Sequence, residues 1–113
     1  MKEMEKLLCR DRSAVKDPEM KKVYPAALEE LFRRNSQVLY LDADLMRAVG
    51  TVGLWKRWPD RVIQCGIAEA NMVGVAAGLS SEGYVPIVHT FAAFASRRVM
   101  DQVFMSCAYA DLN

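Results

Sequence analysis

Three short apolar runs in this chain each end in residues that can do chemistry. The runs are 37–41, 61–64 and 85–90. The residues at or directly after their ends are Asp42 with Asp44, Cys65, and Thr90. A short apolar run bounded by turn residues is typical of a buried strand in a parallel sheet. Because ligands of open α/β sheets bind at the carboxyl ends of the strands, we expect these residues to line one rim that forms the site.

Glu69 is the acid in the first turn of a helix predicted after the second run. Gly66 permits a tight turn there, and from Ile67 onward apolar and small residues recur at helical spacing. An acid in a first turn complements the helix dipole and contributes about 0.3–1 kcal/mol. Such acids are common, so the residues alone favour this structural role for Glu69 over a catalytic one.

The alternation of strands and helices predicts an α/β fold, an open, mainly parallel sheet with flanking helices. A helix containing AALEELFRR precedes the first strand, with Pro25 expected in its first turn. A second helix begins at Ile67 and stops at Gly83, and a third follows the last strand. Gly74 and Gly78 each cost the second helix roughly 1 kcal/mol relative to alanine. We therefore expect another helix backbone to pack closely against them.

Length and composition predict one soluble domain. The 113 residues are 52% hydrophobic and 26% charged, with a formal net charge of +1, which gives no sign of nucleic-acid binding. The cysteines Cys9, Cys65 and Cys107 form no C-x-x-C pair, so we expect reduced thiols in a cytoplasmic protein and no metal site. The start MKEMEKLLCRDR lacks the apolar core of a signal peptide. No uncharged stretch reaches the ~20 residues of a membrane span.

Two motifs in sequence order carry a family resemblance. GIAEANMVGVAAGL begins at Gly66, and P-x-x-x-TFAAF, followed by DQ, begins at Pro86. Together they closely resemble the pyrimidine-binding domain of transketolase, and the split form, in which two polypeptides carry the two halves, is the most similar. The resemblance extends from about Val38 to the end of the chain. We assign residues 21–113 to a partial domain of this family and residues 1–20 to an N-terminal helical extension or linker.

The resemblance implies a C-terminal transketolase subunit that is truncated. The chain has room for about three strand–helix units, whereas the family's pyrimidine domain is longer and is usually followed by another domain. An open sheet edge is then expected beyond the last strand. The implied reaction is the thiamine-diphosphate-dependent transfer of a two-carbon ketol unit between sugar phosphates, in the pentose phosphate pathway.

The resemblance also implies roles for single residues. Glu69 becomes the catalytic residue: it hydrogen-bonds the N1′ atom of the cofactor's aminopyrimidine, and burial raises the pKa of its carboxyl so that a proton is shared there. Phe91 and Phe94 line the slot in which the aminopyrimidine ring stacks. Asp44 lies close to the cofactor near the subunit interface.

Partners follow from the same resemblance. The family's diphosphate-binding half uses a G-D-G…N element to hold magnesium and the diphosphate, and this sequence has no such element. A partner N-terminal subunit is therefore implied, in a dimer or larger homo- or hetero-oligomer, with Gly74 and Gly78 close to a subunit contact. Lys21 and Lys22 fall near a position where many members carry an arginine that grips the sugar phosphate.

Other interpretations stay open. The chain is alternatively a non-catalytic truncated remnant or a regulatory partner, or a deoxyxylulose-phosphate-synthase-like enzyme that shares the glutamate. The run ending in D-x-D resembles the first motif of haloacid-dehalogenase-type phosphotransferases, with Asp42 as nucleophile and Asp44 as general acid, although Met46 departs from that pattern. His89, the single histidine, is interpreted as structural, because no G-x-S-x-G elbow accompanies it.

Overall fold

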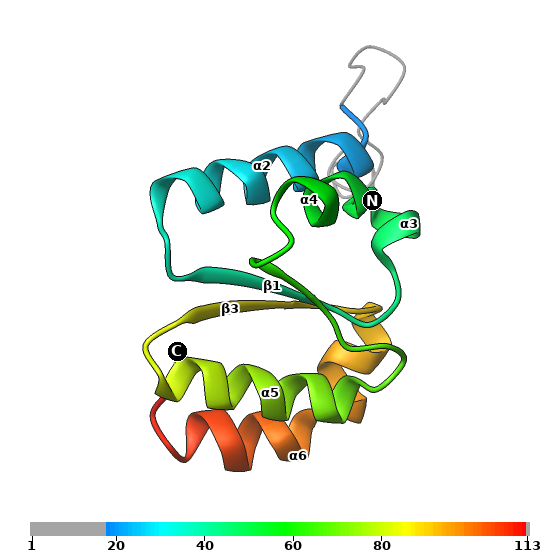
Figure 1. Cartoon of the computed structure of the whole chain (residues 1–113). Coiled ribbons are helices and arrows are strands. Elements are labelled where there is room, and N and C mark those ends of the chain that lie inside the picture. Colours follow the sequence, from blue (N-terminus) through cyan, green and yellow to red (C-terminus); the bar gives the residue numbers. More distant parts are fainter. Residues whose placement is uncertain (1–17, 113) are drawn as a thin grey trace, which may run out of the picture.

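A computed structural model describes residues 18–112 and shows a three-layer arrangement of helices, sheet and helices (Figure 1). The sheet has three parallel strands in the order β2-β1-β3. In chain order the elements are α2 (Met20–Arg34), β1 (Val38–Asp42), α3 (Met46–Val49), α4 (Val52–Arg57), β2 (Val62–Gln64), α5 (Glu69–Ser81), β3 (Val85–His89), the π-helical segment η1 (Phe94–Arg98), α6 (Met100–Gln102) and a second π-helical segment, η2 (Val103–Ala108). The predicted fold class is confirmed.

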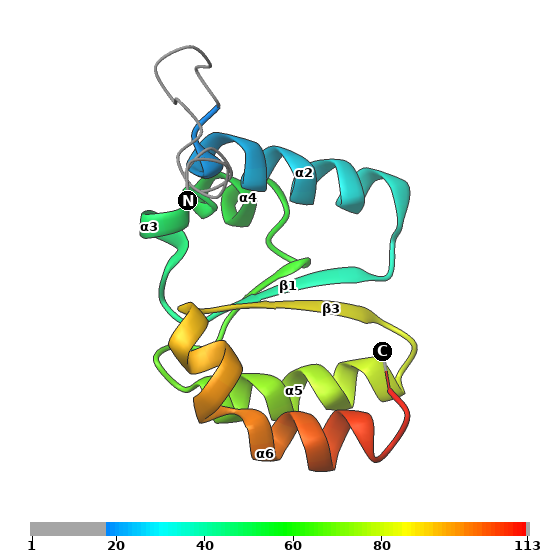
Figure 2. The same ribbon diagram turned by 180° about the vertical axis from the view of Figure 1, so that it is seen from behind.

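Strand β1 lies at the centre and is buried along its whole length. Helices α2, α3 and α4 cover one face of the sheet, and α5 with α6 covers the other (Figures 1 and 2). Successive side chains of a strand point to opposite faces. Val38 and Tyr40 accordingly pack in the core beneath α2 and α4, whereas Leu39 and Leu41 pack in the core beneath α5. A strand buried on both faces must be apolar throughout, which explains the continuous run in the sequence.

The three strands end level with one another. Asp42 at the end of β1 is paired with Gln64 of β2 and with His89 of β3. The first turns of α2 and α5 and the whole of α3 lie at this same end of the molecule (Figure 2). The rim predicted from the three apolar runs is confirmed, and we call this edge of the sheet the carboxyl rim.

Helix α5 begins later than predicted, at Glu69 rather than Ile67, whose side chain is 77% exposed. Gly74 and Gly78 are exposed, and outside the backbone of α5 itself no atom of the described chain lies within 4 Å of the position a Cβ would take at either. No other helix of the described chain therefore packs closely against them, and the close contact stays a prediction for another subunit. Gly83 ends the helix as predicted, in a turn with a φ of 86°.

Helix α2 also differs from its prediction, because it begins at Met20 and Pro25 lies inside it rather than in its first turn. Pro25 has no N–H to donate to the carbonyl of Lys21. Gly50, directly after α3, lies against this part of α2: its φ is 85°, and a Cβ there would stand 2.7 Å from the Lys21 carbonyl oxygen. Only glycine fits this position, and the contact holds the start of α2 beside α3.

Residues 1–17, which make up most of the predicted N-terminal extension, lie outside the described residues, as does Asn113. Within the described range, no helix is long and apolar enough to cross a membrane. Strand β3 forms one edge of the three-stranded sheet, and its Val88 is 41% exposed.

We predict that Leu41→Ala destabilises the chain by about 2–5 kcal/mol, because it leaves a cavity in the centre of the sheet. Leu41 is fully buried in β1, whereas Leu31 of α2 is 42% exposed and supplies a matched control. For Leu31→Ala we expect a change within about 0.5 kcal/mol. Urea unfolding of the full chain measures both. Equal losses for the two variants would contradict the placement of β1 at the centre of the core.

Candidate functional site

A slot of about 160 Å³ opens at the carboxyl rim, between the end of β1, the start of α5 and the segment after β3. Its lining includes all four site residues predicted from the sequence, Asp44, Glu69, Phe91 and Phe94. We call it the glutamate slot. A protein cavity of ~150 Å³ holds one benzene molecule, so the slot has the size of a single six-membered ring.

Glu69 presents the carboxylate of this slot. It is the first residue of α5 and is 4% exposed. Its Oε1 accepts a hydrogen bond of 3.2 Å from the Thr90 hydroxyl, and its Oε2 accepts one of 3.0 Å from Arg98 Nη1. A carboxylate has about four acceptor sites, so the group retains acceptor capacity for a ligand.

The pKa of Glu69 is lowered, and the raised pKa implied by the family resemblance is therefore wrong. The largest cause is a hydrogen bond from the residue's own backbone N–H. Arg98 and Thr90 add to it, and together these contacts outweigh the opposite effect of burial. The carboxylate is thus held in its charged form at neutral pH.

Two aromatic rings form a wall of the slot. Phe91 and Phe94 meet edge to face, with ring centroids 5.9 Å apart and an interplanar angle of 72°. The Arg98 guanidinium lies 3.7 Å from the centroid of the Phe94 ring, a cation–π contact. Arg98 is not among the residues that line the slot, so it fixes both Phe94 and Glu69 from outside. The π-helical geometry of η1 accompanies this arrangement, and π-helical turns are frequent at functional sites.

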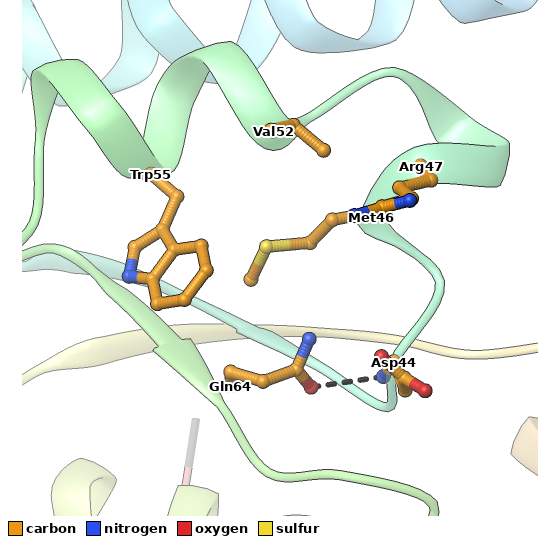
Figure 3. Close-up of a pocket in the computed structure, with 6 residues that line it drawn as sticks. All are labelled: Asp44, Met46, Arg47, Val52, Trp55 and Gln64. Carbon is orange, nitrogen blue, oxygen red and sulfur yellow. Dashed lines mark hydrogen bonds between the residues drawn. The ribbon is translucent and has the colours of Figure 1, made fainter.

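Asp44 lines both the slot and a second pocket of about 530 Å³, and Figure 3 shows the second pocket. Its backbone has a φ of 64°, which aspartate tolerates better than most residues. The Asp44 N–H donates a 2.9 Å hydrogen bond to Gln64 Oε1, which also accepts one of 3.0 Å from Gly66 N–H. Gln64 thereby ties the loop after β1 to the turn after β2. In the larger pocket, Trp55 and Met46 face this amide (Figure 3).

Asp42 is fully buried, which argues against the phosphotransferase interpretation. Its Oδ1 accepts a hydrogen bond from the Leu45 N–H, and its Oδ2 accepts one of 2.7 Å from the Tyr40 hydroxyl and contacts His89 Nδ1 at 3.1 Å. A nucleophilic carboxylate must reach its substrate, and this one is enclosed. In residues 18–112, no group of three His, Cys, Asp or Glu side chains lies close enough together to hold a metal ion.

Sequence reasoning missed two residues of the site, Arg98 and Gln64. It placed Thr90 at the rim but did not identify it as a partner of Glu69. Thr90 and Arg98 lie 21 and 29 residues from Glu69, and hydrogen bonds over such separations produce no periodic pattern in the sequence. The one available signal was the pair of charged residues Arg97 and Arg98 within a stretch whose neighbouring residues are mostly apolar or small.

Comparisons with known proteins agree on one family. Residues 16–113 match the family model described as transketolase, pyrimidine binding domain. A 6-deoxy-6-sulfo-D-fructose transketolase subunit from Clostridium sp. is 48% identical over 94 residues, which are 83% of this chain and 29% of that protein. A transketolase C-terminal section from Methanocaldococcus jannaschii is 37% identical over 94 residues, or 83% of this chain and 30% of that protein.

Among solved structures, a similar chain is titled split gene transketolase, inactive beta4 tetramer. It matches with a TM-score of 0.73 at 41% sequence identity. The match covers 83% of this chain and 31% of that one. The chain thus spans less than a third of the length of these relatives.

We predict that Arg98→Met raises the pKa of Glu69, because the variant removes the cationic partner and leaves the carboxyl buried. Carbon-13 NMR of the glutamate carboxyl as a function of pH measures the change. Arg97→Met is the matched control, since Arg97 has no ion pair in the part of the chain that the structure describes. An unchanged Glu69 pKa in Arg98→Met would contradict the ion pair.

The same lowered pKa predicts a pH dependence of stability. Because the folded-state pKa of Glu69 lies below its unfolded value, the stabilisation is fully present above the unfolded pKa and is lost as the pH falls through the folded pKa. The wild-type chain should therefore lose more free energy of unfolding on acidification than Arg98→Met does. Urea midpoints over a series of acidic buffers test this, and parallel curves for the two proteins would refute it.

Proposed function

The chain belongs to the transketolase family as a pyrimidine-binding domain, and from this premise we propose that it forms part of an enzyme that transfers two-carbon ketol units between sugar phosphates. The observation that carries the proposal is the meeting of Glu69, Phe91 and Phe94 at one slot. Family membership implies thiamine diphosphate as the cofactor. The slot suits its aminopyrimidine ring, because it is one ring in size, has aromatic walls and offers one carboxylate.

Each slot residue has a task in this proposal. When bound, thiamine diphosphate supplies the carbon nucleophile of ketol transfer. Glu69 binds the ring nitrogen N1′ and holds a proton at that atom, which its charged carboxylate favours. Phe91 and Phe94 orient the ring by stacking and keep water away from it. Arg98 and Thr90 act as positioning residues, because their hydrogen bonds keep the Glu69 carboxylate aimed at the slot.

We propose that a separate diphosphate-binding subunit completes the site and holds magnesium with the diphosphate. Ile67 and Phe91 border the slot and are 77% and 57% exposed, so apolar surface is open where such a partner would pack. The solved relative whose title names an inactive tetramer of one kind of chain supports the need for a second kind.

A contact between subunits along α5 belongs to the same proposal. Gly74 and Gly78 are exposed beside Val75, which is 37% exposed. A helix surface of small residues lets another backbone approach closely. Because the described chain places nothing there, we assign this surface to a contact with a second subunit in a homo- or hetero-oligomer.

The substrate class is a sugar that carries a terminal anion. Sugar phosphates are the family expectation, and sulfonated sugars are a second candidate because the relative that is 48% identical is named for a sulfofructose. Lys21 and Lys22, at the start of α2, are exposed near the carboxyl rim. A lysine ammonium is a compact charge that attracts either anion without the bidentate geometry of arginine.

We predict that Glu69→Gln lowers ketol transfer about 10²- to 10⁴-fold in a complex reconstituted with a diphosphate-binding subunit, because the amide cannot hold the N1′ proton. Assembly should be unchanged by light scattering. Glu82→Gln is the control, since Glu82 is exposed at the other end of α5. Near-normal transfer by Glu69→Gln would defeat the catalytic assignment, and a wild-type complex without transfer would favour a non-catalytic role.

We also predict that the chain without its partner binds thiamine diphosphate weakly. The glutamate slot offers ring stacking and one carboxylate, whereas the diphosphate is held elsewhere. Calorimetric titration of the chain, with and without magnesium, tests this. Tight, magnesium-dependent binding by the chain alone would contradict the proposed division of the site between two subunits.

A further inference from the structure

A third pocket, of about 330 Å³, lies at the carboxyl rim beside the glutamate slot. The two share Leu45 and Phe91 as lining residues, so they adjoin each other. The remaining walls come from the start of α2, from α3 and from the end of β3. The residues there that carry polar side chains are Lys21 and His89. We call this space the histidine pocket.

The imidazole of His89 is held in one orientation. Its Nδ1 contacts Asp42 Oδ2 at 3.1 Å, and Asp42 is fully buried. The ring also packs near Tyr24 and Tyr40, with centroid distances of 5.5 and 6.2 Å. Both oxygens of the Asp42 carboxyl also accept hydrogen bonds, from the Leu45 N–H and the Tyr40 hydroxyl, so Asp42 faces the histidine as a hydrogen-bond acceptor.

This contact decides which nitrogen of His89 is free to bind. A carboxylate only accepts hydrogen bonds, so Nδ1 carries the hydrogen in the neutral ring and Nε2 carries the lone pair. The side chain is 24% exposed and lines the histidine pocket. Within residues 18–112, no hydrogen-bonding partner is found for Nε2. The arrangement presents a fixed hydrogen-bond acceptor to whatever occupies the pocket.

We propose that His89 is a substrate-binding residue whose Nε2 accepts a hydrogen bond from a sugar hydroxyl. The ligand class follows from the two polar groups of the pocket: a fixed acceptor requires a hydroxyl donor, and the Lys21 ammonium attracts an anionic group. A hydroxylated sugar with a terminal anion has both. This inference rests on the proposed function, because the substrate must reach the neighbouring glutamate slot. It adds a ligand-binding role to the structural role that the sequence suggested for His89.

Because His89 is the only histidine of the chain, one imidazole can be followed without ambiguity. The chain is labelled with nitrogen-15 histidine and assembled with an unlabelled diphosphate-binding subunit, thiamine diphosphate and magnesium. Long-range proton–nitrogen NMR of the neutral ring should show hydrogen on Nδ1. Adding ribose 5-phosphate should shift the Nε2 resonance, and adding inorganic phosphate alone should not. In Asp42→Asn, the carboxylate that fixes the tautomer of His89 is absent, so we expect the sugar-dependent shift of the Nε2 resonance to be lost.

Two variants separate binding from folding. His89→Asn keeps an N–H near the position of Nδ1, for Asp42, and removes Nε2. We expect it to raise the KM for the sugar about 3- to 12-fold, the effect of losing one hydrogen bond, with the melting temperature and the Kd for thiamine diphosphate unchanged. His89→Gln places an amide near Nε2 and loses the contact with Asp42, so it should lower the melting temperature and change KM less. A purely structural histidine would show the reverse pattern.

The outcomes distinguish this inference from the proposed function. Normal ketol transfer, with no sugar-dependent shift of Nε2 and no change of KM in His89→Asn, would overturn the role of His89 and leave the proposed function in place. A sugar-dependent shift in a complex that transfers no ketol group would support the His89 site and reject the proposed function. A complex that shows neither transfer nor shift would overturn both.

Discussion

The buried carboxylate of Asp42 is the constraint on which the carboxyl rim depends. A carboxylate removed from water must have its hydrogen bonds supplied by the protein. Here they come from three places: Tyr40 on the same strand, the Leu45 N–H of the following loop, and His89 at the end of β3. A one-residue slip of β3 would turn His89 to the opposite face and leave Asp42 without that partner. The register of the sheet and the course of the loop are thus fixed together.

The glutamate slot and the histidine pocket are both consequences of that register. The loop that Asp42 holds contributes Leu45 to both spaces, and Phe91, two residues after His89, stands between them. On the slot side, the pKa of Glu69 is kept low by its own backbone N–H and by Arg98 and Thr90. On the pocket side, His89 is kept in one tautomer by Asp42. The two buried carboxylates at the rim therefore act differently. Glu69 faces the ligand site directly, whereas Asp42 orients His89, which faces it.

Much of the fold and of the site could be predicted from the sequence, because apolar runs and turn residues are local patterns. Apolar runs marked the three strands within a residue or two of their observed ends, and the four predicted slot residues lie together. The errors concern helix starts and charge. The start of α5 was placed two residues early, and Pro25 was placed in the first turn of α2. The pKa of Glu69 was expected to rise, because burial was considered without its partners.

The sequence by itself determined the strand–helix alternation, the parallel sheet and the identity of the residues at the ends of the strands. These features follow from hydrophobic periodicity and turn residues, which act over a few neighbouring positions. Only the tertiary structure decided which partners those residues meet. Arg98 reaches Glu69 across 29 residues, and His89 reaches Asp42 across 47. Such pairings depend on strand order, register and helix geometry together. They fix the charge of Glu69 and the tautomer of His89.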